Sequence, residues 1–162
     1  NCRTGEANYF EEKKDPVRLL NICRASCSLP FVCPITHVDG EPMLDGGICD
    51  AIPIRKAIAD GFSRNVVVLT RNKGYRKDES KKSIPWFMYR RYPAMRKSLK
   101  TKNKHYNETL DYVERLEEEG KVIVIRPEKV LEVDRIERDV EKLTDLYNQG
   151  YECAKRALSS YL

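Results

Sequence analysis

Apolar residues recur every three or four positions in several stretches of the chain, and this period predicts helices. The first stretch begins at Asp15-Pro16, a typical helix start, and its helix must end before Pro30. Pro53 opens a shorter helix that Gly61 ends. A third helix is predicted over residues 107–119, which a glycine also follows.

The C-terminal part of the chain carries the longest helical pattern. An apolar stripe over residues 136–158 predicts a helix of about seven turns. Asp134 and Glu137, at its start, have the spacing of a capping box. Residues 83–95 hold four aromatic residues among arginines, and we expect this segment to be mostly helical, broken near its prolines.

Two short segments, 66–69 and 121–127, each contain four consecutive apolar residues and predict strands that are buried on both faces. Asp39-Gly40 predicts a tight hairpin turn between two further short strands, because both residues tolerate positive φ. Short strands alternate with helices along the chain. The pattern therefore predicts an α/β fold in one domain that covers residues 1–162.

Asp45 follows the second strand of the predicted hairpin, and Gly46 and Gly47 come directly after it. A carboxylate beside backbone without side chains leaves room for another group to approach. The stretch is a candidate for chemistry. A solvated aspartate in a glycine turn is the alternative that local sequence leaves open.

The chain has 162 residues, 41% hydrophobic and 34% charged, which suits a globular domain with a real core. It contains no apolar run long enough to span a membrane and no visible secretory signal. It holds six cysteines but no Cys-x-x-Cys pair, and its two histidines, His37 and His105, are far apart. We therefore expect reduced cysteines and neither a zinc site nor another cofactor, with Cys23 and Cys27 as small core residues of one helix.

Positive charge is concentrated in residues 71–104, a segment with 13 lysines and arginines and two acids. The whole chain has a net charge of only +5, so the remainder is mildly acidic. Aromatic residues among the basic ones suit an anionic membrane surface or nucleic acid. A solvated surface whose tyrosines and tryptophan face the core is the third alternative.

Several common catalytic motifs are absent from the sequence. There is no glycine-rich phosphate loop and no G-x-S-x-G nucleophile elbow. Ser63 comes nearest to an elbow, but it lies in a predicted helix-to-strand connection, the wrong context. His37 stands just before the hairpin turn, where we expect a half-buried polar residue rather than a catalytic base.

The order of the motifs carries a resemblance to a known family. It rests on Arg24 to Phe31, Val38-Asp39-Gly40, Leu44-Asp45-Gly46-Gly47, Asp50 to Ile54 and Val66 to Thr70. This series resembles the C-terminal half of patatin-like phospholipases, notably their bacterial branch. Thr4-Gly5-Glu6, Gly74-Tyr75-Arg76 and Ile125-Arg126-Pro127-Glu128 are also similar to that branch.

The resemblance implies an acyl-ester or phospholipid hydrolase that uses a Ser-Asp dyad. Asp45 matches the dyad aspartate, and Gly46 and Gly47 complete its motif. The serine and the oxyanion loop have no counterpart here, so the resemblance implies the C-terminal part of a three-layer α/β fold that is inactive by itself and able to self-associate. It further implies a lipid or acyl-ester substrate. The reduced cysteines indicate a cytoplasmic protein, the basic residues 71–104 favour peripheral contact with anionic membrane, and we expect no nucleic-acid partner. A non-catalytic module that binds membrane or nucleic acid through residues 71–104 is the alternative.

Overall fold

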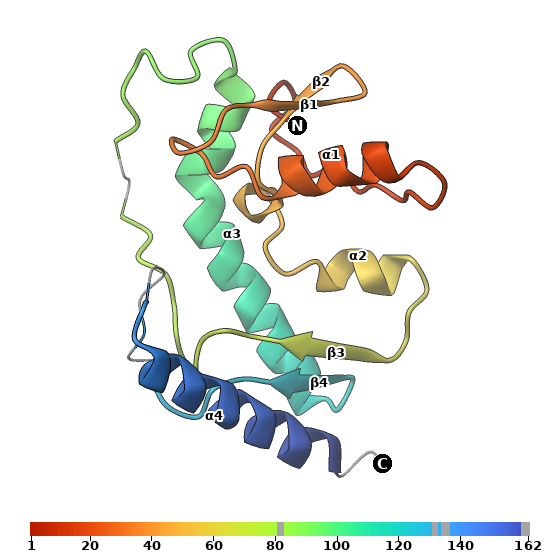
Figure 1. Cartoon of the computed structure of the whole chain (residues 1–162), viewed down its shortest axis with the longest axis vertical. Coiled ribbons are helices and arrows are strands. Elements are labelled where there is room, and N and C mark those ends of the chain that lie inside the picture. Colours follow the sequence, from red (N-terminus) through yellow and green to blue (C-terminus); the bar gives the residue numbers. More distant parts are fainter. Residues whose placement is uncertain (81–82, 131–132, 134–136, 160–162) are drawn as a thin grey trace. The chain divides into compact units, whose positions relative to one another are not determined.

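The computed structural model describes all residues except 81–82, 131–132, 134–136 and 160–162 (Figure 1). Its elements in chain order are α1 (Pro16–Ser26), β1 (Thr36–Val38), β2 (Glu41–Met43), the 3₁₀ helix η1 (Gly46–Ile48), α2 (Ile54–Ala59), β3 (Asn65–Val68), α3 (Pro93–Glu118), β4 (Val122–Ile125) and α4 (Val140–Ser159). They form two compact units, one of residues 1–52 and 77–109 and one of residues 53–76 and 110–162. The single-domain prediction stays a prediction.

Helix α1 of the first unit begins where the sequence predicts. The Asp15 carboxylate accepts hydrogen bonds from the backbone N–H groups of Val17 (2.9 Å) and Arg18 (3.0 Å), so it caps two donors that the first turn leaves unpaired. The proline that follows needs no such partner. The helix ends at Ser26, well before Pro30, as predicted.

The hairpin is also confirmed. Strands β1 and β2 pair antiparallel, with Thr36 opposite Met43. Asp39 and Gly40 in the turn have φ values of 52° and 79°, which match a primed turn. Met43 and Val38 turn their side chains toward Ala25 of α1, and these three residues form one buried cluster.

A second buried cluster joins the chain after the hairpin to the start of α3. It consists of five residues, Cys2, Leu44, Ile48, Met95 and Leu99. The N-terminal turn is close to α3 as well, because a Cβ atom on Gly5 would lie 2.8 Å from the Ala94 backbone. Leu44 and Ile48 therefore fix the segment between them, which contains Asp45.

The second unit contains a two-stranded parallel sheet of β3 and β4, with Val66 opposite Ile123. Helices combined with such a sheet are consistent with the predicted α/β class. Burial on both faces is wrong for β3, since Val66 and Val68 are 51% and 69% exposed while Val67 is buried. Side chains alternate along a strand, and the described part of the chain covers β3 on one face.

Ion pairs tie α3 to the ends of both parallel strands. Arg76, which follows β3, contacts Asp111 (2.6 Å) and Glu114 (2.7 Å). Arg126, which follows β4, contacts Glu114 (3.5 Å) and also pairs with Glu117. The hydrogen bond from Arg76 and the charge of Arg126 lower the pKa of the Glu114 carboxyl. Two arginines that follow the paired strands thus share one carboxylate.

The largest difference from prediction concerns α3, which begins at Pro93 rather than near residue 107. Its first half is rich in lysine and lacks a broad apolar stripe, but Met95 and Leu99 suffice to bury one face. Residues 83–92 form turns and not a mostly helical segment. Tyr89 has a φ of 54°, which a helix excludes.

Two smaller predictions also need correction. Cys23 and Cys27 are exposed rather than buried in the core, because the face of α1 that carries Val17 and Leu20 is itself exposed. The predicted capping box lies in part outside the described residues, at Asp134. Asp139 instead caps α4 and accepts a hydrogen bond of 2.9 Å from the Glu141 N–H.

Candidate functional site

Asp45 lies where strand β2 ends and η1 begins. Its backbone N–H donates to the Ser28 carbonyl at 2.9 Å, so the segment after α1 holds it in place. The Ser28 side chain is buried and lies 3.0 Å from the Thr36 hydroxyl of β1. A helix, a hairpin and a buried hydroxyl pair therefore determine the position of Asp45.

The Asp45 carboxylate makes one hydrogen bond among the described residues. Its Oδ1 atom accepts the Gly47 backbone N–H at 2.7 Å, which caps η1. The side chain is half-buried, and no described lysine or arginine forms an ion pair with it. One oxygen is thus oriented by the backbone while Oδ2 keeps its lone pairs for another group.

The two glycines keep the space around this carboxylate open. Gly46 and Gly47 are both exposed. A Cβ atom on Gly47 would lie only 2.9 Å from Asp45 Oδ1, so a larger residue there would push the carboxylate away. A Cβ atom on Gly46 would meet nothing nearer than the Ser26 hydroxyl at 4.0 Å. Gly47 is therefore needed for the position of the Asp45 carboxylate, and Gly46 leaves space for another group to approach that carboxylate.

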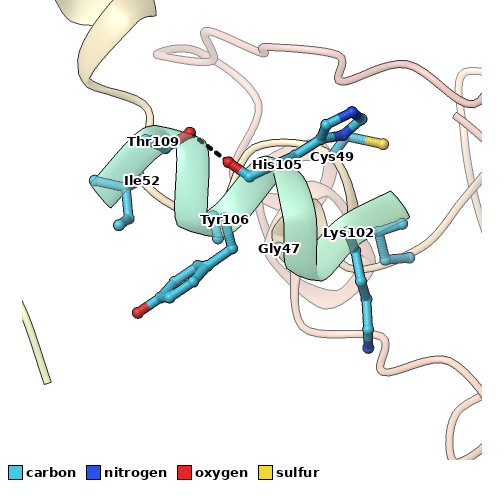
Figure 2. Close-up of a pocket in the computed structure, with 9 residues that line it drawn as sticks. Gly47, Cys49, Ile52, Lys102, His105, Tyr106 and Thr109 are labelled. Atoms are coloured by element: carbon cyan, nitrogen blue, oxygen red, sulfur yellow. Dashed lines mark hydrogen bonds between the residues drawn. The ribbon is translucent and has the colours of Figure 1, made fainter. Parts of the chain in front are cut away.

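Behind the glycines a small pocket separates η1 from α3 (Figure 2). Gly47 and Cys49 line it on one side, and Lys102, His105 and Tyr106 of α3 line it on the other. Its volume of about 10 Å³ is close to what one water molecule needs, so it is not a substrate cavity. It nevertheless places two basic side chains on the helix that borders the motif.

The cysteine nearest to the motif is not a rival nucleophile. Cys49 is half-buried, and its Sγ–H donates to the Gly5 carbonyl at 3.1 Å. Burial raises the pKa of the Cys49 thiol above its ordinary value, and the same holds for Cys2. Both groups stay protonated near neutral pH, and a thiol is a much weaker nucleophile than a thiolate.

The other candidates from the sequence do not join Asp45. His37 is exposed in the middle of β1, so the expected half-buried position is wrong. Ser63 lies in the exposed loop between α2 and β3, the plain loop position that its context predicts. Within the described residues, no three histidine, cysteine or acidic side chains are placed to hold a metal ion.

Some residues that shape the site carry no signal that sequence reasoning used. Ser28 and Thr36 are separated by an irregular loop, and only the fold brings their hydroxyls together. Lys102 and His105 lie in the half of α3 that was not predicted to be helical. The four-residue spacing of Met95 and Leu99 is a local signal for that half of the helix, but two apolar residues are too few to predict a helix.

The comparisons with known proteins cover two parts of the chain. Residues 92–162 match the model of a domain of unknown function (DUF6363), and residues 4–58 match the model of the patatin-like phospholipases. No curated protein and no solved structure was found to match the chain. No described helix has the length and apolar character that crossing a membrane requires. Over residues 4–58, which include Asp45, Gly46 and Gly47, the chain is thus similar to the patatin-like phospholipases, as the motif order predicts.

Proposed function

We propose that the chain belongs to an acyl-ester lipid hydrolase of the Ser-Asp dyad type and that Asp45 is its general base. The single observation that carries this proposal is a half-buried carboxylate, fixed through one oxygen and open through the other, inside the segment that matches the family. The class of substrate follows from the family likeness. The bacterial branch and the three-layer α/β fold belong to the same proposal.

In the proposed reaction, Asp45 Oδ2 takes the proton from a serine hydroxyl, and the serine oxygen attacks the ester carbonyl. Backbone N–H groups would stabilise the oxyanion of the tetrahedral intermediate. Asp45 then returns the proton to the departing alcohol, and the same base activates a water molecule that releases the fatty acid from the acyl-serine. Weak bases such as carboxylates serve here only if they are held within about 3 Å of the hydroxyl.

The sequence has no G-x-S-x-G elbow, so the proposal assigns the serine to residues other than these 162. The 162-residue chain alone should therefore hydrolyse neither a short p-nitrophenyl ester nor a phospholipid. Turnover of this chain that Asp45→Asn abolishes would show that the serine lies within it and would contradict this part of the proposal.

The decisive experiment uses the full product of the gene and a fluorophosphonate probe, which labels activated serines. We expect labelling of one serine, loss of labelling in the Asp45→Asn variant, and release of fatty acid from phospholipid vesicles. Absence of both labelling and release would favour the alternative, a non-catalytic module in which residues 45–47 form only a turn.

A further inference from the structure

The Arg96 side chain of α3 bonds to several backbone carbonyls of the residues before that helix, 84–92. The Arg96 guanidinium donates through Nη1 to the carbonyls of Pro85 (2.8 Å) and Met88 and through Nη2 to the carbonyl of Ile84 (3.2 Å). A charged donor that bonds to several backbone carbonyls gives a loop a defined shape without a helix or a sheet. We call residues 84–92 the aromatic loop.

One side of the aromatic loop faces the protein. Ile84, Tyr89 and Tyr92 pack against the buried cluster that contains Leu44 and Ile48. The Tyr89 hydroxyl accepts the Phe31 N–H at 2.8 Å, and the two rings lie 5.5 Å apart. Tyr89 and Tyr92 therefore face the core, as one of the three alternatives from the sequence has it.

The other side exposes the largest apolar side chains of the loop. Trp86 and Phe87 are 75% and 61% exposed, and their rings meet edge to face at 6.2 Å. The tryptophan is therefore not a core residue, contrary to one of the alternatives that the sequence left open. Two adjacent exposed aromatic rings on a shaped loop are a costly feature in water and mark a binding surface.

Positive charge surrounds these rings. Arg90 and Arg91 are exposed and form no ion pair with a described carboxylate. Residues 83–100 contain five basic residues and no acidic one. A shallow depression of about 360 Å³ lies beside the two arginines and is lined by Ile35, Phe87, Tyr89, Arg90, Arg91 and Tyr92.

We infer that the aromatic loop is an interfacial anchor for membranes that contain anionic lipid. Trp86 and Phe87 would enter the boundary between headgroups and acyl chains, where tryptophan is favoured, and Arg90 and Arg91 would contact lipid phosphates. An exposed tryptophan beside arginines is typical of membrane-interface anchors. Nucleic-acid bases could stack on the same rings, so binding of a nucleic acid is one of the outcomes that the test distinguishes. This inference does not depend on Asp45 being catalytic.

The 162-residue chain carries its own probe, because Trp86 is the single tryptophan among these residues. Vesicles of phosphatidylglycerol and phosphatidylcholine should shift its emission to the blue, and lipids brominated on the acyl chain should quench it. Vesicles of phosphatidylcholine alone should give a much weaker response. The readout requires no turnover, so its failure is distinct from a failure of the proposed enzyme.

Variants test the two components separately. Arg90→Gln with Arg91→Gln should weaken binding to anionic vesicles about 30-fold, at about 1 kcal/mol for each charge. Arg64→Gln with Lys155→Gln removes the same charge from exposed positions elsewhere and should have a much smaller effect. Phe87→Ala should reduce both binding and the blue shift while the thermal midpoint stays unchanged.

Three results would overturn the inference. One is an emission spectrum that anionic vesicles leave unchanged. Another is equal loss of binding in the two double variants, because general attraction of a basic protein would then explain the binding. The third is binding of a single-stranded oligonucleotide that needs Arg90 and Arg91 without any vesicle binding, which would assign the loop to nucleic acid.

Discussion

Asp39 and Asp45 stand at opposite ends of strand β2. The partners of their carboxylates suit a structural role for Asp39 and leave Asp45 available for a chemical one. Both oxygens of Asp39 are used by one side chain, since Arg18 donates to Oδ1 (3.1 Å) and to Oδ2 (2.7 Å). Asp45 accepts a single backbone N–H and has no described ion pair. A general base needs an oxygen that can approach the proton it takes, and among the described contacts Asp45 keeps one oxygen without a partner while Asp39 keeps none.

The same contrast holds for the glycines beside them. Gly40 has a φ of +79°, and a Cβ atom there would meet nothing within 4 Å. A Cβ atom on Gly47 would meet the Asp45 carboxylate. Gly40 is therefore needed for the backbone conformation of the turn, while Gly47 is needed to leave space for the Asp45 side chain. Sequence motifs that look alike, Asp-Gly in both places, have different physical reasons.

Replacement of the two aspartates should give the largest difference. In the full product of the gene, Asp45→Asn should lower kcat for ester hydrolysis by about 10²–10⁴-fold, the usual loss when a general base is removed. Asp39→Asn should leave kcat within a small factor and reduce thermal stability. Steady-state kinetics with melting curves measures both, and equal kinetic losses in the two variants would contradict the assignment of Asp45.

The two glycines offer a second pair. Gly47→Ala should displace the Asp45 carboxylate by a fraction of an ångström to about 1 Å and lower kcat by up to about 10²-fold, with little change in stability. Gly40→Ala should cost about 1 kcal/mol of unfolding free energy, since alanine is strained at positive φ, and should leave kcat unchanged. Denaturant titrations and kinetics together distinguish these outcomes; loss of stability at Gly47 with normal kcat would refute the role given to it.

Arg18 provides a smaller test, because it neutralises the structural aspartate. Arg18→Met keeps the aliphatic stem but frees Asp39 and also Glu12, which pairs with Arg18 at 2.6 Å. The thermal midpoint should fall modestly, and the kcat of the full gene product should not change. A change in kcat would contradict the purely structural role of Asp39, since it would mean that the hairpin turn influences Asp45 at the other end of β2.

The smallest effect concerns acid stability. Backbone N–H groups of Asp15 and Lys14 and the Arg18 guanidinium lower the pKa of Glu12 from 4.5 to about 2, and Arg18 lowers the pKa of Asp39 as well. Carboxylates with a lowered pKa stabilise the folded state above their ordinary pKa, and this stabilisation is lost as the pH falls through the folded-state value. Unfolding free energy should therefore decrease from about pH 4.5 to about pH 2, and Arg18→Met should flatten that slope.

Local sequence signals predicted the elements that local chemistry determines. Asp15-Pro16 starts α1 and Asp39-Gly40 turns the hairpin, because a capping carboxylate and positive φ act within a few residues. The position of Asp45 after the second strand could also be predicted, because it follows from the hairpin. The resemblance also assigned Asp45 a chemical role, which stays a prediction, since the match over residues 4–58 supports only the likeness to the family.

Features that depend on distant contacts could not be predicted in this way. The first half of α3 is helical because Met95 and Leu99 reach a cluster near the hairpin. The aromatic loop takes its shape from Arg96, a residue inside the following helix. Neither the exposure of Trp86 nor the hydroxyl pair that holds Asp45 can be read from spacing, because each results from which segments meet in the fold.

The way in which Arg96 holds the aromatic loop has a consequence for how freely this segment can change. The guanidinium donates to main-chain carbonyls, which every amino acid supplies. The backbone conformation of the loop therefore does not depend on the side chains at positions 86 and 87. Folding therefore places little constraint on those two positions, and their identity is left to selection at the surface. For protein engineering, residues 86 and 87 form a natural display site where other short peptides can be grafted.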